Sequence, residues 1–204
     1  MEIIHGTDTN VFKKTLLASA VTLGSATAVA ELSMTVGMVS DYVYRGVELG
    51  DAGAYTSVDY AAGGFYAGVW AISDGSTADG IEYDIYAGYE TEIAGVGVGI
   101  GYTAYEYTYG TAAEDEISLS LSKGPISLTY VDGELVDDTE YEWLILGADV
   151  GAFSFTYGEE DESDYDYMEV STGTEVGAVS LGVTLGSNSD GNDYLVLDMS
   201  TGID

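Results

Sequence analysis

Strict alternation of side-chain type along short segments constrains the fold of this chain most. In "GVGVGIG", the apolar residues Val96, Val98 and Ile100 alternate with Gly97 and Gly99. In a β-strand, a period of two residues places these two sets on opposite faces. The same alternation recurs in 81–90, 116–122 and 179–185. We therefore predict strands with one apolar face and one small or polar face.

The composition agrees with many short strands in one domain. The 204 residues contain one proline, 28 glycines and 18 tyrosines, which disfavours long helices. We predict an all-β fold of about 12 antiparallel strands, at about 32–45, 53–61, 64–73, 81–91, 95–108, 116–122, 125–131, 140–149, 152–158, 165–172, 177–185 and 193–201.

The connections between these strands alternate between long and short. The long ones are "GVELGDA", "DGSTADG", "YGTAAEDE", "DGELVDDT", "GEEDESD" and "GSNSDGN"; the short ones are "AGG", "EIAGV", "KGP", "VGA" and "GTEVG". An up-and-down transmembrane β-barrel sorts its connections in this way, with long loops at one end and short turns at the other. A closed barrel also satisfies its backbone hydrogen bonds inside a membrane.

A basic and then apolar segment precedes the strands. Lys13 and Lys14 are followed by "TLLASAVTLGSATAVA", which is typical of a secretory signal peptide cleaved after Ala30. The alternative is an N-terminal membrane anchor. We predict a leader and signal peptide at 1–30 and a barrel domain at 31–204.

The charge balance excludes several functions. There are 36 acidic and 4 basic residues, a net charge of −32, so binding to nucleic acid is excluded. Beyond position 30 the only basic residues are Arg45 and Lys123, and the only histidine is His5. With no cysteine and no phosphate-binding loop, we predict no enzyme activity and no catalytic residues.

One arginine among acids is the candidate pore site. Asp41 and Arg45 share one face of the first expected strand, and the lumen candidates are Asp41, Arg45, Glu82, Asp84 and Glu90. Two interpretations stay open. In the first, these residues form a charged constriction that sets ion selectivity. In the second, which we favour, they form a salt-bridge network that closes a narrow barrel.

Tyrosines near the strand ends predict an aromatic girdle at the membrane interface. The candidates are Tyr42, Tyr44, Tyr102, Tyr105 and Tyr107.

Acidic runs offer weak sites for Ca²⁺ or Mg²⁺, without EF-hand spacing. The candidates are Glu159, Glu160, Asp161, Asp190 and Asp193. No other cofactor is expected. Divalent ions could bridge these loops to lipopolysaccharide.

Residues 39–90 resemble the TorF family of proteobacterial outer-membrane porins. The resemblance rests on "VSDYVYRG", "GFYAGVWAIS" and "EYDIYAGYE". It implies an outer-membrane barrel and a pore, with no established substrate or catalytic residue. The chain departs from outer-membrane habit because its last strand, "YLVLDMSTGID", has no terminal aromatic residue.

Together these features predict a channel in the outer membrane of a Gram-negative bacterium, with cation preference. Its expected partners are outer-membrane lipid and lipopolysaccharide, the barrel assembly machinery, and small solutes or ions. Two alternatives remain. One is a closed structural or adhesive barrel with acidic external loops, and the other is a secreted soluble β-sandwich that binds carbohydrate or calcium.

Overall fold

A computed structural model describes residues 30–73, 80–109, 113–161 and 163–203. The predicted leader at 1–30 lies, except for Ala30, outside the described residues. The strands are β1(Glu31–Val39), β2(Tyr42–Tyr44), β3(Val47–Gly50), β4(Gly53–Ala62), β5(Phe65–Ser73), β6(Glu82–Ile93), β7(Val96–Tyr107), β8(Ala113–Lys123), β9(Ile126–Leu135), β10(Glu140–Val150), β11(Phe153–Glu160), β12(Asp166–Val176), β13(Val179–Asn188) and β14(Asp193–Ile203).

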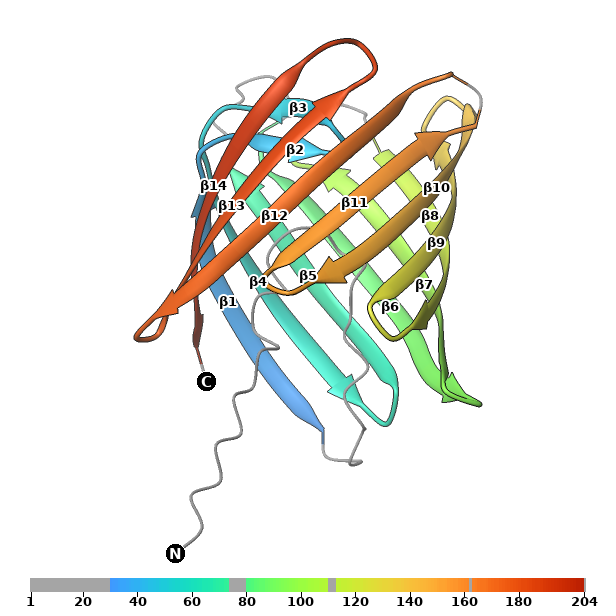
Figure 1. Cartoon of the computed structure of the whole chain (residues 1–204), viewed down its shortest axis with the longest axis vertical. Helices are drawn as coiled ribbons and strands as arrows, with labels where there is room; N and C mark the ends of the chain where they lie inside the picture. Colours follow the sequence, from blue (N-terminus) through green and yellow to red (C-terminus); the bar gives the residue numbers. More distant parts are fainter. Residues whose placement is uncertain (1–29, 74–79, 110–112, 162, 204) are drawn as a thin grey trace, which may run out of the picture.

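Twelve of these strands form a closed antiparallel barrel. Each strand from β4 to β14 pairs with the next along the chain, and β1 pairs with both β4 and β14 to close the ring (Figure 1). The closing register sets Met34 opposite Ile203 and Val39 opposite Asp198. The predicted up-and-down barrel of about 12 strands is confirmed. The described residues contain no helix long and apolar enough to cross a membrane.

The outer face of the barrel is apolar. Ile100, Leu119 and Leu197 point outward and are each about half exposed, at 52%, 51% and 50%. They follow the alternation seen in the sequence, since Ile100 and Leu119 are directly opposed on β7 and β8. A continuous apolar band of this kind is unfavourable in water, whereas it matches the hydrocarbon core of a bilayer.

Glycines on the inner face make room for tyrosines. A Cβ built on Gly133 would overlap the ring of Tyr141, which stands directly opposite it on β10. The same direct cross-strand pairing holds for Gly37 with Tyr55, Gly68 with Tyr86, Gly88 with Tyr66, Gly158 with Tyr167, and Gly186 with Tyr194. Each tyrosine lies over a glycine of the adjacent strand, so the two residues pack as one unit.

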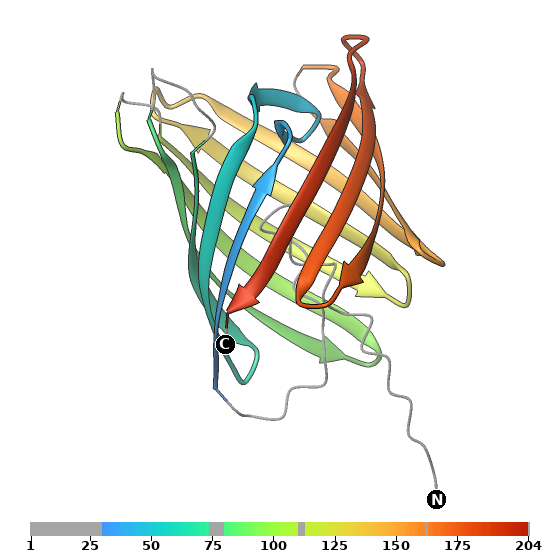
Figure 2. The same cartoon turned by 90° about the vertical axis from the view of Figure 1, so that its left-hand side faces the viewer.

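The two ends of the barrel differ as the connections predicted. Strand β1 begins and strand β14 ends at the end that carries the short turns, and the long connections that the structure describes lie at the other end (Figures 1 and 2). One short turn contains Gly64, with φ of +89°, where an added Cβ would meet a carbonyl of Glu90. Below, the end with the long connections is called the mouth.

The predicted strand 32–45 is wrong beyond Val39. After β1 the chain leaves the wall, and β2 pairs with β3 in a separate two-stranded sheet. The two residues between them, Arg45 and Gly46, have φ of +47° and +79°. Positive φ at both positions is what a tight two-residue hairpin turn requires. We call residues 40–52, with β2 and β3, the inner hairpin.

Candidate channel constriction

The inner hairpin lies against the inside of the mouth rather than out in solvent. Arg45 and Val43 are buried, with 5% and 7% of their surface exposed. Val43 belongs to an apolar cluster with Val39 and Ile72 on the wall. At the turn, Asn188 Nδ2 donates a hydrogen bond of 2.8 Å to the Gly46 carbonyl. The hairpin is therefore fixed to several strands of the barrel.

Its tip is held by a bidentate ion pair. Arg45 Nη1 donates to Glu116 Oε1 at 2.6 Å, and Nη2 donates to Oε2 at 2.9 Å. Glu116 is 5% exposed and comes from β8. The hydroxyls of Tyr105 and Tyr141 also donate to this carboxylate, each at 2.9 Å. A buried pair with these extra donors has the geometry that offsets its desolvation.

Aromatic rings enclose the guanidinium. Its Cζ lies 4.6 Å from the ring centroid of Tyr44 and 5.3 Å from that of Trp143. The Tyr44 hydroxyl is 2.7 Å from that of Tyr105, which extends the hydrogen-bonded chain to Glu116. Cation–π contacts of this kind add to the ion pair in a desolvated site.

Beside this pair is a carboxylate without a cationic partner. Asp84, on β6, is 5% exposed, and its Oδ1 is buried without a hydrogen-bond partner among the described residues. Its electrostatic neighbours are the carboxylates of Glu82, Glu114 and Glu116. The Tyr42 hydroxyl donates to Glu82 at 2.7 Å, which joins the start of the hairpin to the same wall. The constriction thus carries several carboxylates and one guanidinium.

The lumen toward the short turns is lined differently. Its inner positions are small or hydroxylated on most strands, as on β8, where Ser118, Ser120 and Ser122 face Gly101, Gly99 and Gly97. Tyrosine hydroxyls are paired with carboxylates along the wall, including Tyr55 with Asp198 at 2.7 Å, Tyr86 with Asp59, and Tyr194 with Glu169 at 2.8 Å. Away from the inner hairpin, the wall is polar and acidic.

The structure brings together three of the five lumen candidates. Arg45, Glu82 and Asp84 lie at the constriction. Glu90 lies on the inner face of β6 at the other end, next to Gly99 of β7. Asp41 lies in the bend before β2, and no contact joins it to Arg45, because the chain turns away from the wall between them.

Four of the five girdle candidates are not on the outer face, which corrects that prediction. Tyr42 and Tyr44 belong to the inner hairpin and bond to Glu82 and Tyr105. Tyr105 is 6% exposed and inside, and Tyr107 is opposite the inward Glu82. The reason is the alternation of β7: Tyr105 and Tyr107 lie on the same inward face as its glycines, whereas Tyr102 lies on the opposite face. Only Tyr102 points outward, where its hydroxyl bonds Asp115 at 2.7 Å.

Glu116, Glu114 and Trp143 are site residues that the sequence reasoning missed. Glu114 and Glu116 continue the serine face of "EISLSLSKG", so strict alternation could have placed them in the lumen. Trp143 alternates with the outward Leu144 and is 7% exposed.

The candidate metal ligands are dispersed around the mouth. Glu160 ends β11 on the inner face, while Glu159 and Asp193 are on the outer face of β11 and β14. Within the described ranges, no three carboxylate or imidazole groups are arranged to hold a metal ion. Hydrogen bonds from Thr139 lower the pKa of Asp137 in the connection after β9.

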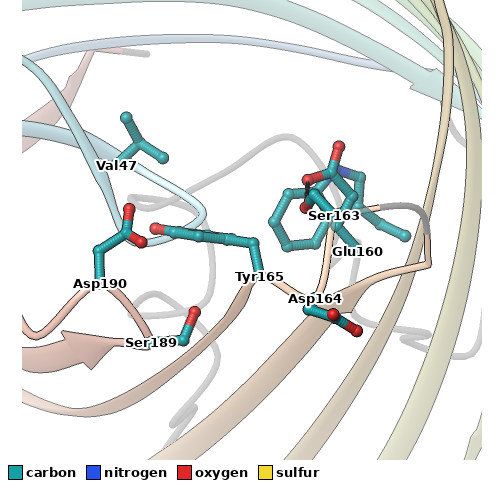
Figure 3. A pocket seen from close by; sticks show the side chains of 8 residues that line it. Val47, Glu160, Ser163, Asp164, Tyr165, Ser189 and Asp190 are labelled. Carbon is teal, nitrogen blue, oxygen red and sulfur yellow. Dashed lines mark hydrogen bonds between the residues drawn. The ribbon is translucent and has the colours of Figure 1, made fainter.

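A pocket of about 500 Å³ opens at the mouth between the inner hairpin and two long connections. Figure 3 shows Tyr165 lying across it, with its hydroxyl toward Asp190. Val47 of the hairpin and Trp143 of β10 contribute apolar surface.

A closed twelve-stranded antiparallel barrel with an apolar exterior and a polar lumen has the architecture of outer-membrane β-barrels. The chain belongs to the family described as "Bacterial protein of unknown function (Gcw_chp)", whose model matches residues 24–132. That range includes residues 39–90, on which the resemblance to porins rests. No curated protein matches the chain.

Two solved structures of the KdgM porin share this fold. The KdgM porin in complex with disordered oligogalacturonate has a TM-score of 0.53 and 10% identity, covering 85% of this chain and 96% of that one. A second KdgM porin structure has a TM-score of 0.55 and 9% identity, covering 86% and 99%. Outer membrane phospholipase A from Escherichia coli has a TM-score of 0.44 and 11% identity, covering 85% and 95%.

Proposed function

We propose that this protein is a cation-preferring channel for small solutes in the outer membrane of a Gram-negative bacterium. The inner hairpin forms its constriction, the leader at 1–30 directs export, and the apolar outer face contacts lipid. Assignment to the TorF family of porins is part of this proposal. So is the lack of catalysis.

The observation that carries the proposal is the excess of acidic over basic side chains at the constriction. Among the described residues Arg45 is its only cation, and Glu116 pairs with it through both oxygens. Asp84, Glu82 and Glu114 add carboxylates that Arg45 does not bridge. A narrow passage with excess negative charge attracts cations and repels anions.

The same charge argues against an acidic oligosaccharide as the solute. One KdgM structure is a complex with oligogalacturonate, a chain of carboxylated sugars. At the constriction such a polyanion would meet Asp84, Glu82 and their neighbours, and Arg45, the cation that the described residues place there, is already paired with Glu116. We therefore propose small cationic or neutral solutes, in spite of the shared fold.

The proposal is tested first by location and then by flux. On gels of outer-membrane fractions, the unboiled protein should migrate differently from the boiled protein, because closed barrels resist detergent. Liposomes containing the folded protein should then take up small amines faster than liposomes without it. Recovery in the soluble fraction would favour the secreted sandwich, and a shift without flux would favour the closed barrel.

The closed structural barrel is the second candidate, and one observation favours it. Arg45, Tyr44 and Trp143 fill part of the mouth with buried side chains. In that case the acidic connections would act as the functional surface, toward lipopolysaccharide and weakly bound Ca²⁺ or Mg²⁺. Interaction with the barrel assembly machinery is expected for either candidate. Strand β14 ends in Ile203 and not in an aromatic residue.

A further inference from the structure

The pocket at the mouth is separate from the Arg45–Glu116 pair and has its own walls. It lies between Val47 of the inner hairpin, Trp143 of the wall, and the connections that precede β12 and β14. Its volume of about 500 Å³ is in the range of pockets that hold small molecules.

Two aromatic rings form a corner of this pocket. The centroids of Trp143 and Tyr165 are 5.9 Å apart, and the ring planes meet at 81°. Trp143 already has a cation, Arg45, over its ring. Rings set at right angles present π surface from two directions, the arrangement by which aromatic sites hold organic cations.

The polar lining can mainly accept hydrogen bonds. Glu160, Asp164 and Asp190 contribute carboxylates, and the described residues that line the pocket include no cation. Ser163 donates to Glu160, whereas Asp164 and Asp190 make no hydrogen bond or ion pair within the described part of the chain. Ionised carboxylates are acceptors only, so the matching ligand group is a charged donor.

The Tyr165 hydroxyl lies among acidic side chains at the edge of the pocket. Figure 3 shows it directed toward Asp190. Burial raises the pKa of Tyr165, and the carboxylates of Asp190, Glu160 and Asp166 raise it further. A cation beside Tyr165 and Asp190 would therefore enter a region of negative potential.

From the aromatic corner, the acceptor-only lining and the cavity, we propose that this pocket binds small primary organic ammonium ions. The ammonium group bonds Asp190, and the carbon chain packs on Tyr165 and Trp143. The site lies at the entrance of the proposed channel, so the ions that it binds are also the solute class that we propose for the channel. Its role in transport rests on the proposed function, but binding itself can be measured without flux.

The test uses Trp143 as its own reporter. The chain has two tryptophans, so Trp70→Phe leaves Trp143 as the only one. This folded variant in detergent is titrated with propylammonium, with propanol as the neutral analogue and glucose as a neutral sugar. We expect a saturable fluorescence change with propylammonium alone.

Two carboxylates at the same end give a matched pair of variants. Asp190 lines the pocket, while Asp193 lies on the outer face of β14. Asp190→Asn should weaken propylammonium binding by roughly fivefold, the upper range for a solvent-accessible ion pair, and Asp193→Asn should not. No saturable response, an equal response to propanol, or saturation by glucose instead would overturn the proposal. Such a result alongside flux in liposomes would leave the channel function intact.

Discussion

Arg45 and Glu116 join two parts of the barrel that are nearly opposite in the ring. Arg45 belongs to the connection between β1 and β4, whereas β8, which carries Glu116, is reached only after β5, β6 and β7. Both guanidinium nitrogens contact the carboxylate, at 2.6 and 2.9 Å. The inner hairpin therefore crosses the mouth instead of lying along the wall beside its own strands.

Removing one partner of this pair should release the hairpin. Glu116→Gln leaves the Arg45 guanidinium buried without a counter-charge, which costs about 3–5 kcal/mol for a buried pair. We expect a larger single-channel conductance in planar bilayers, because the hairpin no longer stays docked.

Two variants control for this effect. Asp115→Asn removes the adjacent carboxylate on the outer face of β8, where it accepts a hydrogen bond from Tyr102, and it should leave the conductance nearly unchanged. Arg45→Met with Glu116→Met removes both charges, and it should keep the smaller conductance. An unchanged conductance in Glu116→Gln would show that the pair does not hold the constriction.

Inward glycines beneath tyrosines should resist substitution. Gly133→Ala places a Cβ in the ring of Tyr141, which bonds Glu116, so we expect a loss of about 1–3 kcal/mol from overpacking. Gly182→Ala is the control, because its Cβ would be 3.4 Å from Asp198 Cβ, an ordinary contact. The temperature at which the unboiled band disappears on gels should fall in the first variant only. Equal behaviour would refute the packing argument.

Much of the barrel could be predicted because alternation is a local property. Gly99 and Ile100 lie on opposite faces because successive residues of any β-strand do so. The long and short connections lie at opposite ends of the barrel because successive strands run in opposite directions. The turn at Arg45 and Gly46 could not be predicted, since "DYVYRG" continues the alternation of β1 and lacks an Asn-Gly or Asp-Gly signal. The partner of Arg45 also depends on closure of the ring, which no local pattern encodes.

The outer face should not accept charge, whereas the inner face should. Leu119 and Ser120 are neighbours near the middle of β8 and point to opposite sides. Leu119→Arg should destabilise the barrel by about 2–4 kcal/mol in a bilayer, the cost of arginine near the midplane. Ser120→Arg should cost less, because the lumen is polar. Folding yield into vesicles, followed by the gel shift, compares the two. Equal yields would argue against contact with lipid at Leu119.

Asp84 should contribute strongly to ion preference. Asp84→Asn removes a buried carboxyl group that faces the constriction beside Glu82, Glu114 and Glu116. At about pH 9, where this group is ionised, the permeability ratio of K⁺ to Cl⁻ should fall severalfold, on the order of the change expected for one partly screened charge. Asp193→Asn, on the outer face, should leave that ratio as it was. If both variants behave like the unmodified protein, Asp84 has no part in selectivity.

The most direct test of the account is the reversal potential of the unmodified protein in a planar bilayer. With a KCl gradient across the bilayer, the account predicts stable conductance steps and a reversal potential with the sign of cation preference. Preference should weaken as ionic strength rises toward about 1 M, where the screening length is about 3 Å. Conductance with anion preference, or a folded barrel that never conducts, would contradict it.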